Sequence, residues 1–205
     1  MATATPSHLT DAVRRARTRG RTVRPRRRCF ISYHQDDMDF VVDFVDEFAD
    51  VFVPTALGVT DGADFVASDD QEYIQRRIRE LRLASTTVTI VIVGNCTWSR
   101  RFIDWEIAAS LRDAPRNKRS GLLAFSIPGT TDVKLPARID DNWTSGNPDE
   151  SYAEFRPFPP SRRELRNAIE SAFAARTAKA HLIDNSRALR TTDARCRQPD
   201  RRKPS

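Results

Sequence analysis

The sequence predicts one α/β domain in which helices cover both faces of a mostly parallel sheet. Short β-rich runs alternate with stretches of helical periodicity along the 205 residues, which is the pattern of such a sheet. The run TTVTIVIV, Thr86–Val93, is almost entirely β-branched, as expected of a strand buried on both faces. The length suits one domain with a substantial core.

The first elements follow from apolar spacing. Phe30–Tyr33 is the first predicted strand, and apolar residues then recur at helical spacing over 37–50, behind Asp36 or Asp37 as the N-cap. Val51–Val53 predicts a second strand that ends at Pro54. The long loop that follows, Pro54–Asp70, is expected to be functional or disordered.

The central elements come next. Ser68–Gln71 predicts a capped helix start, with Ile74, Ile78 and Leu81 as the buried stripe. After the strand Thr86–Val93, a third helix is expected near 98–113, with Ile103, Ile107 and Leu111 facing inward.

The last part of the chain holds one more predicted strand and one helix. Leu122–Ile127 reads as the fourth strand, and residues 128–160 read as irregular because they are rich in Pro, Asp and Asn. Ser161–Glu164 is a capping box before a helix of about four turns.

The positive charge lies at the two ends of the chain. Residues 1–28 carry nine Arg and one Asp, residues 184–205 have a net charge of +4, and residues 29–183 have a net charge of −6. We therefore expect a disordered Arg-rich extension over 1–27, the folded domain over 28–183 and a disordered basic tail over 184–205. Binding of the tails to nucleic acid or anionic lipid is the alternative to solvated tails.

Two compositional features bear on location and on metal or disulfide sites. Neither a signal-type apolar N-terminus nor a run of about 18 apolar residues occurs, so we expect a soluble cytoplasmic protein without a membrane partner. The cysteines Cys29, Cys96 and Cys196 are odd in number and widely spaced. They fit neither a disulfide framework nor a zinc site, and no metal is expected.

Polar residues at the end of the first predicted strand are the first candidates for ligand binding. Ligands of open α/β sheets bind outside the carboxyl ends of the strands, where Ser32, Tyr33 and His34 are expected. Phosphate loops, dinucleotide-binding glycine turns and the nucleophile elbow of hydrolases have no match in this sequence. A phosphoacceptor Asp at the end of the central strand is also missing, because that strand ends Val93-Gly94-Asn95.

Glu106 is the remaining candidate for chemistry. On a helical wheel it lies beside the buried stripe of Ile103, Ile107 and Leu111. The alternative is a solvated carboxylate paired with a neighbouring arginine. For Trp98 and Trp105, packing is the usual role.

Four segments, in this order, resemble a known family. CFISYH at 29–34 resembles the first strand of TIR domains. The stretches YIQRRIR at 73–79, STTVTIVIVG at 85–94 and DWEI at 104–107 resemble the TIR-like branch typified by the Thoeris anti-phage protein ThsB. The resemblance covers about residues 28–127. The wider TIR pattern has Trp-Cys some residues before its glutamate, whereas Trp105 directly precedes Glu106 here, as in the ThsB-like branch.

The resemblance implies a flavodoxin-like doubly wound sheet and cleavage of the nicotinamide glycosidic bond of NAD⁺. The product would be a cyclic ADP-ribose-type signal for a partner effector in bacterial defence. NAD⁺ would be the substrate and no cofactor is expected. The family's catalytic glutamate corresponds by motif to Glu106, since one carboxylate can stabilise the oxocarbenium character that develops on the ribose.

The resemblance also suggests roles for nearby residues. Tyr33 would stack on the nucleotide and His34 would donate or accept a hydrogen bond, with Ser32 and Trp98 as further substrate contacts. Asp36 and Asp37 are expected to be helix caps, and the loop 54–70 corresponds to the TIR segment that controls access and self-association. The alternative function is a non-catalytic scaffold for protein interaction.

Overall fold

The sheet is entirely parallel. The computed structural model describes residues 6–18, 25–57, 71–81, 83, 85–114, 118–130, 132–159 and 161–196. The strand order is β2-β1-β3-β4-β5, so the order reverses between β1 and β3. The strands are β1 (Arg28–Ser32), β2 (Val53–Leu57), β3 (Val88–Val93), β4 (Gly121–Ser126) and β5 (Glu154–Pro157). This arrangement confirms the predicted flavodoxin-like α/β class.

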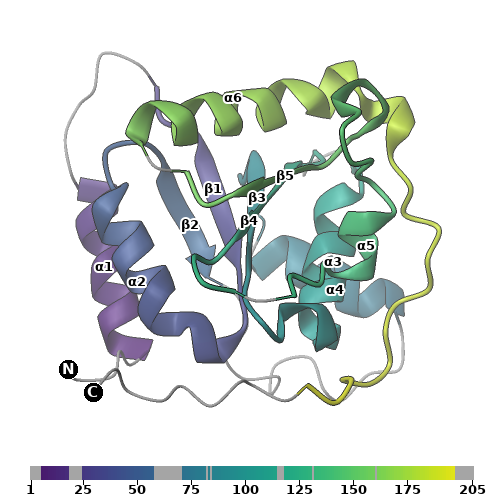
Figure 1. Cartoon of the computed structure of the whole chain (residues 1–205), viewed down its shortest axis with the longest axis horizontal. Coiled ribbons are helices and arrows are strands. Elements are labelled where there is room, and N and C mark those ends of the chain that lie inside the picture. The colour runs from purple at the N-terminus through teal and green to yellow at the C-terminus, as the bar shows by residue number, and fades with distance from the viewer. Residues whose placement is uncertain are drawn as a thin grey trace.

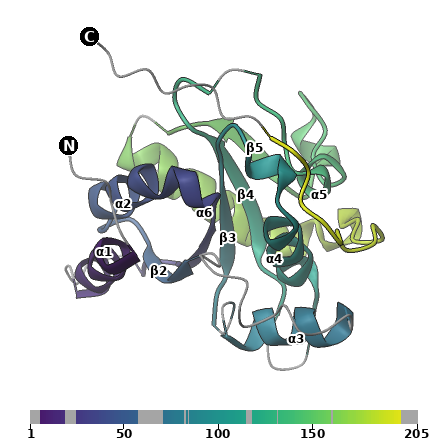
Figure 2. The ribbon, with the colours of Figure 1, turned by 90° about the horizontal axis from the view of Figure 1, so that it is seen from below.

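Helices cover both faces of the sheet (Figures 1 and 2). One face carries α2 (Met38–Glu47) and α6 (Arg162–Ala178), with α1 (Pro6–Thr18) packed on α2. The other face carries α3 (Gln71–Leu81), α4 (Arg101–Leu111) and α5 (Ala137–Asp140). Short 3-10 turns lie at η1 (Gln35–Asp37), η3 (Thr97–Ser99), η4 (Pro148–Glu150) and η5 (Ala180–Leu182).

Strand β3 is buried throughout, as predicted. Its side chains alternate between the faces, with Ile90 and Ile92 in the core under α2 and α6, and Val91 and Val93 in the core under α4. The same alternation turns Ser32 of β1 towards α4, because Ile31 belongs to the opposite core. The register Ser32↔Val91 fixes this arrangement.

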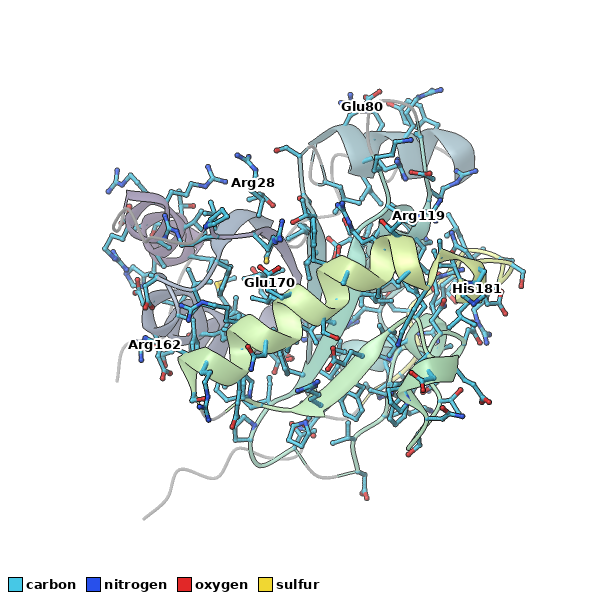
Figure 3. All side chains as sticks on the ribbon, turned by 90° about the horizontal axis from the view of Figure 1, so that it is seen from above. Arg28, Glu80, Arg119, Arg162, Glu170 and His181 are labelled. Atoms are coloured by element: carbon cyan, nitrogen blue, oxygen red, sulfur yellow. A yellow bond between two sulfur atoms is a disulfide. The ribbon has the colours of Figure 1, made fainter. Side chains whose placement is uncertain are left out.

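Helix α6 begins at the predicted capping residue. The Ser161 hydroxyl accepts a hydrogen bond from the backbone N–H of Glu164 at 3.2 Å. Figure 3 shows the helix crossing the molecule, with Arg162 at its start and His181 beyond its end. Glu170, in its middle, accepts a hydrogen bond of 2.8 Å from Arg27 just before β1.

The N-terminal extension is not disordered over its described part. Residues 6–18 form α1, and Leu9, Ala12 and Ala16 are buried against α2. These residues are spaced as one face of a helix. Two of the three are alanines that lie among many arginines, so the hydrophobic pattern of this helix is weak in the sequence. The predicted disorder of 6–18 is therefore wrong.

The C-terminal tail is also ordered over its described part. Residues 184–196 run along α5 and α4, as the yellow segment of Figures 1 and 2 shows, and Leu189 is buried. This segment has almost no regular secondary structure, so neither helical nor strand periodicity could reveal it. The predicted tail 184–205 is corrected for these residues.

Two further elements differ from prediction, and part of a third region is not described. Strand β2 does not end at Pro54 but passes through it, which an edge strand tolerates. Strand β5 lies in the stretch predicted to be irregular, because its four residues EFRP are too few and too charged for a strand pattern. Residues 58–70, with most of the expected loop and the expected cap of α3, lie outside the described residues.

Cys96 and Cys196 form a disulfide with a Cα–Cα distance of 5.6 Å. The prediction that the cysteines fit no disulfide is therefore wrong. The two residues are separated by 100 positions, and spacing alone cannot show which distant residues meet. Cys29 is a free, buried thiol.

No helix within the described ranges is long and apolar enough to cross a lipid bilayer.

Candidate functional site

The candidate site lies at the carboxyl ends of β1 and β3, where the strand order reverses. This is the position at which open α/β sheets bind ligands. The turn after β1 contains His34–Asp37, and the turn after β3 contains Gly94–Ser99. Helix α4 follows the second turn and carries Glu106.

Ser32 and Glu106 are joined directly. The Ser32 hydroxyl donates a hydrogen bond of 2.6 Å to Oε2 of Glu106. Ser32 is completely buried and Glu106 is 1% exposed. The alternative of a solvated carboxylate on the helix surface does not hold, because Glu106 points into the contact between α4 and the sheet.

A second buried polar contact joins α4 to the sheet, at β3. The hydroxyls of Thr89 and Ser110 lie 2.7 Å apart, and Ser110 also donates to the backbone carbonyl of Glu106 at 2.8 Å. Ser110 follows Glu106 by one helical turn, so both side chains face the sheet. Two buried polar contacts therefore set the position of the Glu106 carboxylate.

His34 is buried, and an N–H donor faces each of its two ring nitrogens. Its Nε2 accepts a hydrogen bond of 2.6 Å from Nε of Arg100, and its Nδ1 lies 3.1 Å from the backbone nitrogen of Asp36. Burial lowers the pKa of His34, the positive charge of Arg100 lowers it further, and the carboxylates of Asp36 and Asp193 oppose the change. Burial and the charge of Arg100 thus favour the neutral imidazole.

Of the acidic pair, only Asp37 occupies the predicted N-cap position, at the start of α2. His34, not Asp36 or Asp37, occupies the N-cap of η1, and Asp37 at the N-cap of α2 makes no side-chain capping bond. Asp37 is buried, and its carboxylate lies so close to Gly94 that an added Cβ at Gly94 would be 2.2 Å from Oδ2. Asp37 thus packs across the crevice between the ends of β1 and β3.

Tyr33 is not brought together with Ser32, His34 and Glu106. Its ring belongs to the buried core on the other face of the sheet, with residues of α1, α2 and α6. Strand alternation accounts for this, because Tyr33 stands between Ser32 and His34. Its nucleotide-stacking role stays a prediction.

Trp98 lies in η3 at the edge of the candidate site. Its ring is half-buried, with the Lys134 ammonium 3.6 Å from the ring centroid. Its Nε1 donates a hydrogen bond of 3.1 Å to the Asn95 carbonyl. Trp105, in contrast, packs on the outer side of α4 and donates to the carbonyl of Arg190 at 2.8 Å.

The structure adds two residues that the sequence reading missed, Arg100 and Asp193. Arg100 bonds His34, and its Nη1 lies 3.2 Å from Oδ2 of Asp193. Arg100 lay within the helix predicted near 98–113, so no local signal marked it as a site residue. Asp193 lay in the segment predicted to be disordered, so its contact could not be foreseen.

A cavity of about 290 Å³ lies between residues 143–156 and the C-terminal half of α6. It is lined by none of the predicted site residues. Across the described ranges, no group of three His, Cys, Asp or Glu side chains is arranged to hold a metal ion.

Comparison with known families gives one match. The family model of the TIR-like domain of the Thoeris protein ThsB matches residues 30–132, from β1 past β4. The matched region contains Ser32, His34, Arg100 and Glu106. None of the curated proteins matches the chain.

Proposed function

Because the chain belongs to the family of the Thoeris ThsB TIR-like domain, we propose that it cleaves NAD⁺ and forms a cyclic ADP-ribose-type signal in anti-phage defence. The observation that carries the proposal is the buried pair of Glu106 and Ser32 at the switch point of the sheet. A carboxylate held at this position is suited to stabilise positive charge on a bound ribose.

The chemistry needs one carboxylate and no metal. The bond between the ribose C1′ and the nicotinamide nitrogen breaks, and nicotinamide leaves as a neutral molecule. The Glu106 carboxylate stabilises the oxocarbenium character of the ribose. A nucleophile of the same ADP-ribose then attacks C1′ and releases one proton, which closes the ring.

Access to Glu106 requires a local change. Because the side chain is 1% exposed, neighbouring groups must move aside when the ribose approaches. Ser32 holds the carboxylate from the strand side, and Tyr33, His34 and Trp98 are the other predicted contacts to the nucleotide. Self-association and an effector that responds to the diffusible product are part of the proposal. The cytoplasmic location stays a prediction.

A non-catalytic scaffold is the second candidate. The observation that favours it is the burial of both Glu106 and His34, since buried polar groups with protein partners can serve packing specificity alone. In that case substitution of Glu106 would alter stability, and neither wild type nor the variant would turn over NAD⁺.

The test is NAD⁺ turnover by the full chain, supplied with lysate of phage-infected cells as the trigger. Nicotinamide and cyclic products are measured by mass spectrometry for wild type, Glu106→Gln and the exposed control Glu164→Gln. We expect Glu106→Gln to reduce turnover by about 10²–10³-fold and the control to match wild type. Circular dichroism checks that the variants are folded. Equal turnover by wild type and a folded Glu106→Gln would contradict the proposal.

A further inference from the structure

The C-terminal strap, defined here as residues 184–196, lies along the outer side of α4 and beside α5 (Figures 1 and 2). It is attached by hydrogen bonds spread over its length. These join Asn185 to the Ala108 carbonyl, Arg138 to the Arg187 carbonyl, Trp105 to the Arg190 carbonyl, Arg190 to the Trp98 carbonyl, and the Ala194 N–H to the Ser99 carbonyl. The strap therefore supports the helix that carries Glu106.

Asp193 of the strap caps α4. Its Oδ1 accepts a hydrogen bond of 2.8 Å from the backbone N–H of Arg101, the first residue of the helix. Arg100, at the N-cap position, makes no side-chain capping bond of its own. A carboxylate at a helix N-terminus satisfies an orphan N–H and interacts favourably with the helix dipole.

The same carboxylate reaches the end of β1 through Arg100. Oδ2 of Asp193 lies 3.2 Å from Nη1 of Arg100, and Nε of Arg100 donates to His34 at 2.6 Å. His34 stands two residues after Ser32. Asp193 thus contacts α4 directly and, through Arg100, the turn that follows β1.

The disulfide fastens this end of the strap. Cys196 follows Asp193 by three residues and is bonded to Cys96, in the turn between β3 and η3. Cys96 is buried, whereas Cys196 is partly exposed. Cys196 is therefore the more accessible residue of the disulfide.

We propose that Asp193 is a positioning residue for the proposed NAD⁺ reaction and that the Cys96–Cys196 disulfide is the redox latch that keeps it in place. The inference rests on the proposed function. With the disulfide closed, Asp193 holds Arg100, His34 and the start of α4. When the disulfide opens, this end of the strap is released and turnover falls.

The redox step requires a cellular dithiol as reductant. One thiolate attacks Sγ of Cys196, and Sγ of Cys96 leaves as a thiolate that takes up a proton. The second thiol of the reductant resolves the mixed disulfide and releases Cys196 as a thiol. Two electrons pass to the protein, and the dithiol becomes a disulfide.

The latch is tested by amide hydrogen exchange on the full chain. We expect the Arg101 amide to exchange about tenfold faster in Asp193→Ala and in dithiothreitol-reduced wild type. Asp193→Asn keeps most of the protection, because Asn is also a good capping residue. Arg187→Gln, which removes the strap's ion pair with Asp141 at its other end, leaves the Arg101 amide unchanged. Unchanged exchange in both Asp193→Ala and the reduced protein would overturn the latch.

Positioning is tested by steady-state kinetics on the same proteins with the infected-cell trigger. Asp193→Ala and reduced wild type are expected to lose kcat by about tenfold with a smaller change in KM, whereas Arg187→Gln keeps kcat. Reduction of the Cys96→Ser/Cys196→Ser variant has no further effect. Equal kcat for oxidised and reduced wild type, with altered exchange, would overturn the positioning role. If oxidised wild type releases no nicotinamide, the proposed function and the positioning role both fail. The amide exchange of Arg101 still tests whether the disulfide holds the strap in place.

Discussion

The Ser32 hydroxyl lies 2.6 Å from Oε2 of Glu106 and joins the end of β1 to the middle of α4. Both residues are buried, so this hydrogen bond forms away from bulk water. A buried carboxylate that loses a donor carries the desolvation cost without compensation. The pair therefore contributes to stability as well as to the candidate site.

Ser32→Ala should lower the free energy of unfolding by about 1–3 kcal/mol, because it removes a hydrogen bond to a buried carboxylate. It should also reduce NAD⁺ turnover, because the carboxylate is less firmly oriented. Urea denaturation and the nicotinamide assay measure the two effects. Ser186→Ala, which removes an exposed bond to Asp184, is the control. A stability loss no greater than that of the control would count against the pair.

On the sheet face covered by α3, α4 and α5, Arg138 should be the arginine whose substitution lowers stability most. Its side chain is fully buried and forms a salt bridge of 3.0 Å with Asp104 of α4. Arg138→Met leaves that carboxylate without its charged partner and should cost about 3–5 kcal/mol of stability. Arg162→Met, which breaks an exposed pair with Asp50, should cost less than about 1 kcal/mol. Similar urea midpoints for the two variants would contradict this reading.

The lowered pKa of His34 predicts a pH effect on stability. The unfolded chain titrates near the ordinary value of 6.5, whereas the folded protein takes up the proton only at lower pH. The unfolded state therefore binds more protons between the two pKa values, and stability is lost as the pH falls below about 6.5. The charged groups that face His34 are Asp36, Arg100 and Asp193.

The measurement is the urea midpoint at pH 7.5 and pH 5 for wild type, His34→Gln and the exposed control His181→Gln. The difference between the two pH values should shrink in His34→Gln and stay as in wild type in His181→Gln. Carboxylates contribute to the slope in all three proteins, so only the difference between variants is read. If His34→Gln showed the same difference in urea midpoint between the two pH values as wild type, protonation of His34 would not contribute to the pH dependence of stability.

The number of cysteines that can be alkylated should depend on whether the protein is unfolded and whether it is reduced. Burial raises the pKa of the Cys29 thiol, so the native oxidised protein should resist alkylation. After unfolding without reductant, one cysteine should be alkylated, and after unfolding with reductant all three. Intact-mass spectrometry counts the labels. Three labels without reductant would show that the disulfide is absent from the purified protein.

Helix α1 should be part of the folded core. Ala12 is fully buried, so Ala12→Asp places an unpaired carboxylate between α1 and α2 and should cost about 3 kcal/mol or more. The exposed neighbouring position gives the control Thr10→Asp. Thermal unfolding of both variants makes the comparison, and equal melting temperatures would indicate that α1 does not pack.

The sheet and most of its helices could be predicted because their residues carry local signals. Thr86–Val93 is β-branched throughout, and Ser161 with Glu164 marks the start of α6 before any contact is known. Ser32 and Glu106 were also predicted, one from its place at a strand end and the other by resemblance to a family motif. What remained hidden depends on contacts between distant residues.

Asp193, Arg138 and Cys196 illustrate the limit. Each lies in a stretch with little or no periodicity, and each acts through partners 34 to 100 positions away. A short polar segment reads as tail or loop until its partners are known. Helix α1 was missed for a different reason, because Ala12 and Ala16 fill a narrow contact with Ala side chains that a hydrophobicity pattern barely registers.

The cap supplied by Asp193 also bears on the order in which the protein can mature. The capped amide of Arg101 precedes Asp193 by 92 residues, so translation must pass Asp193 before that carboxylate is available. A nascent or prematurely ended chain can form the sheet yet cannot finish the start of α4. The start of α4 is therefore completed by a segment that is translated well after the helix itself.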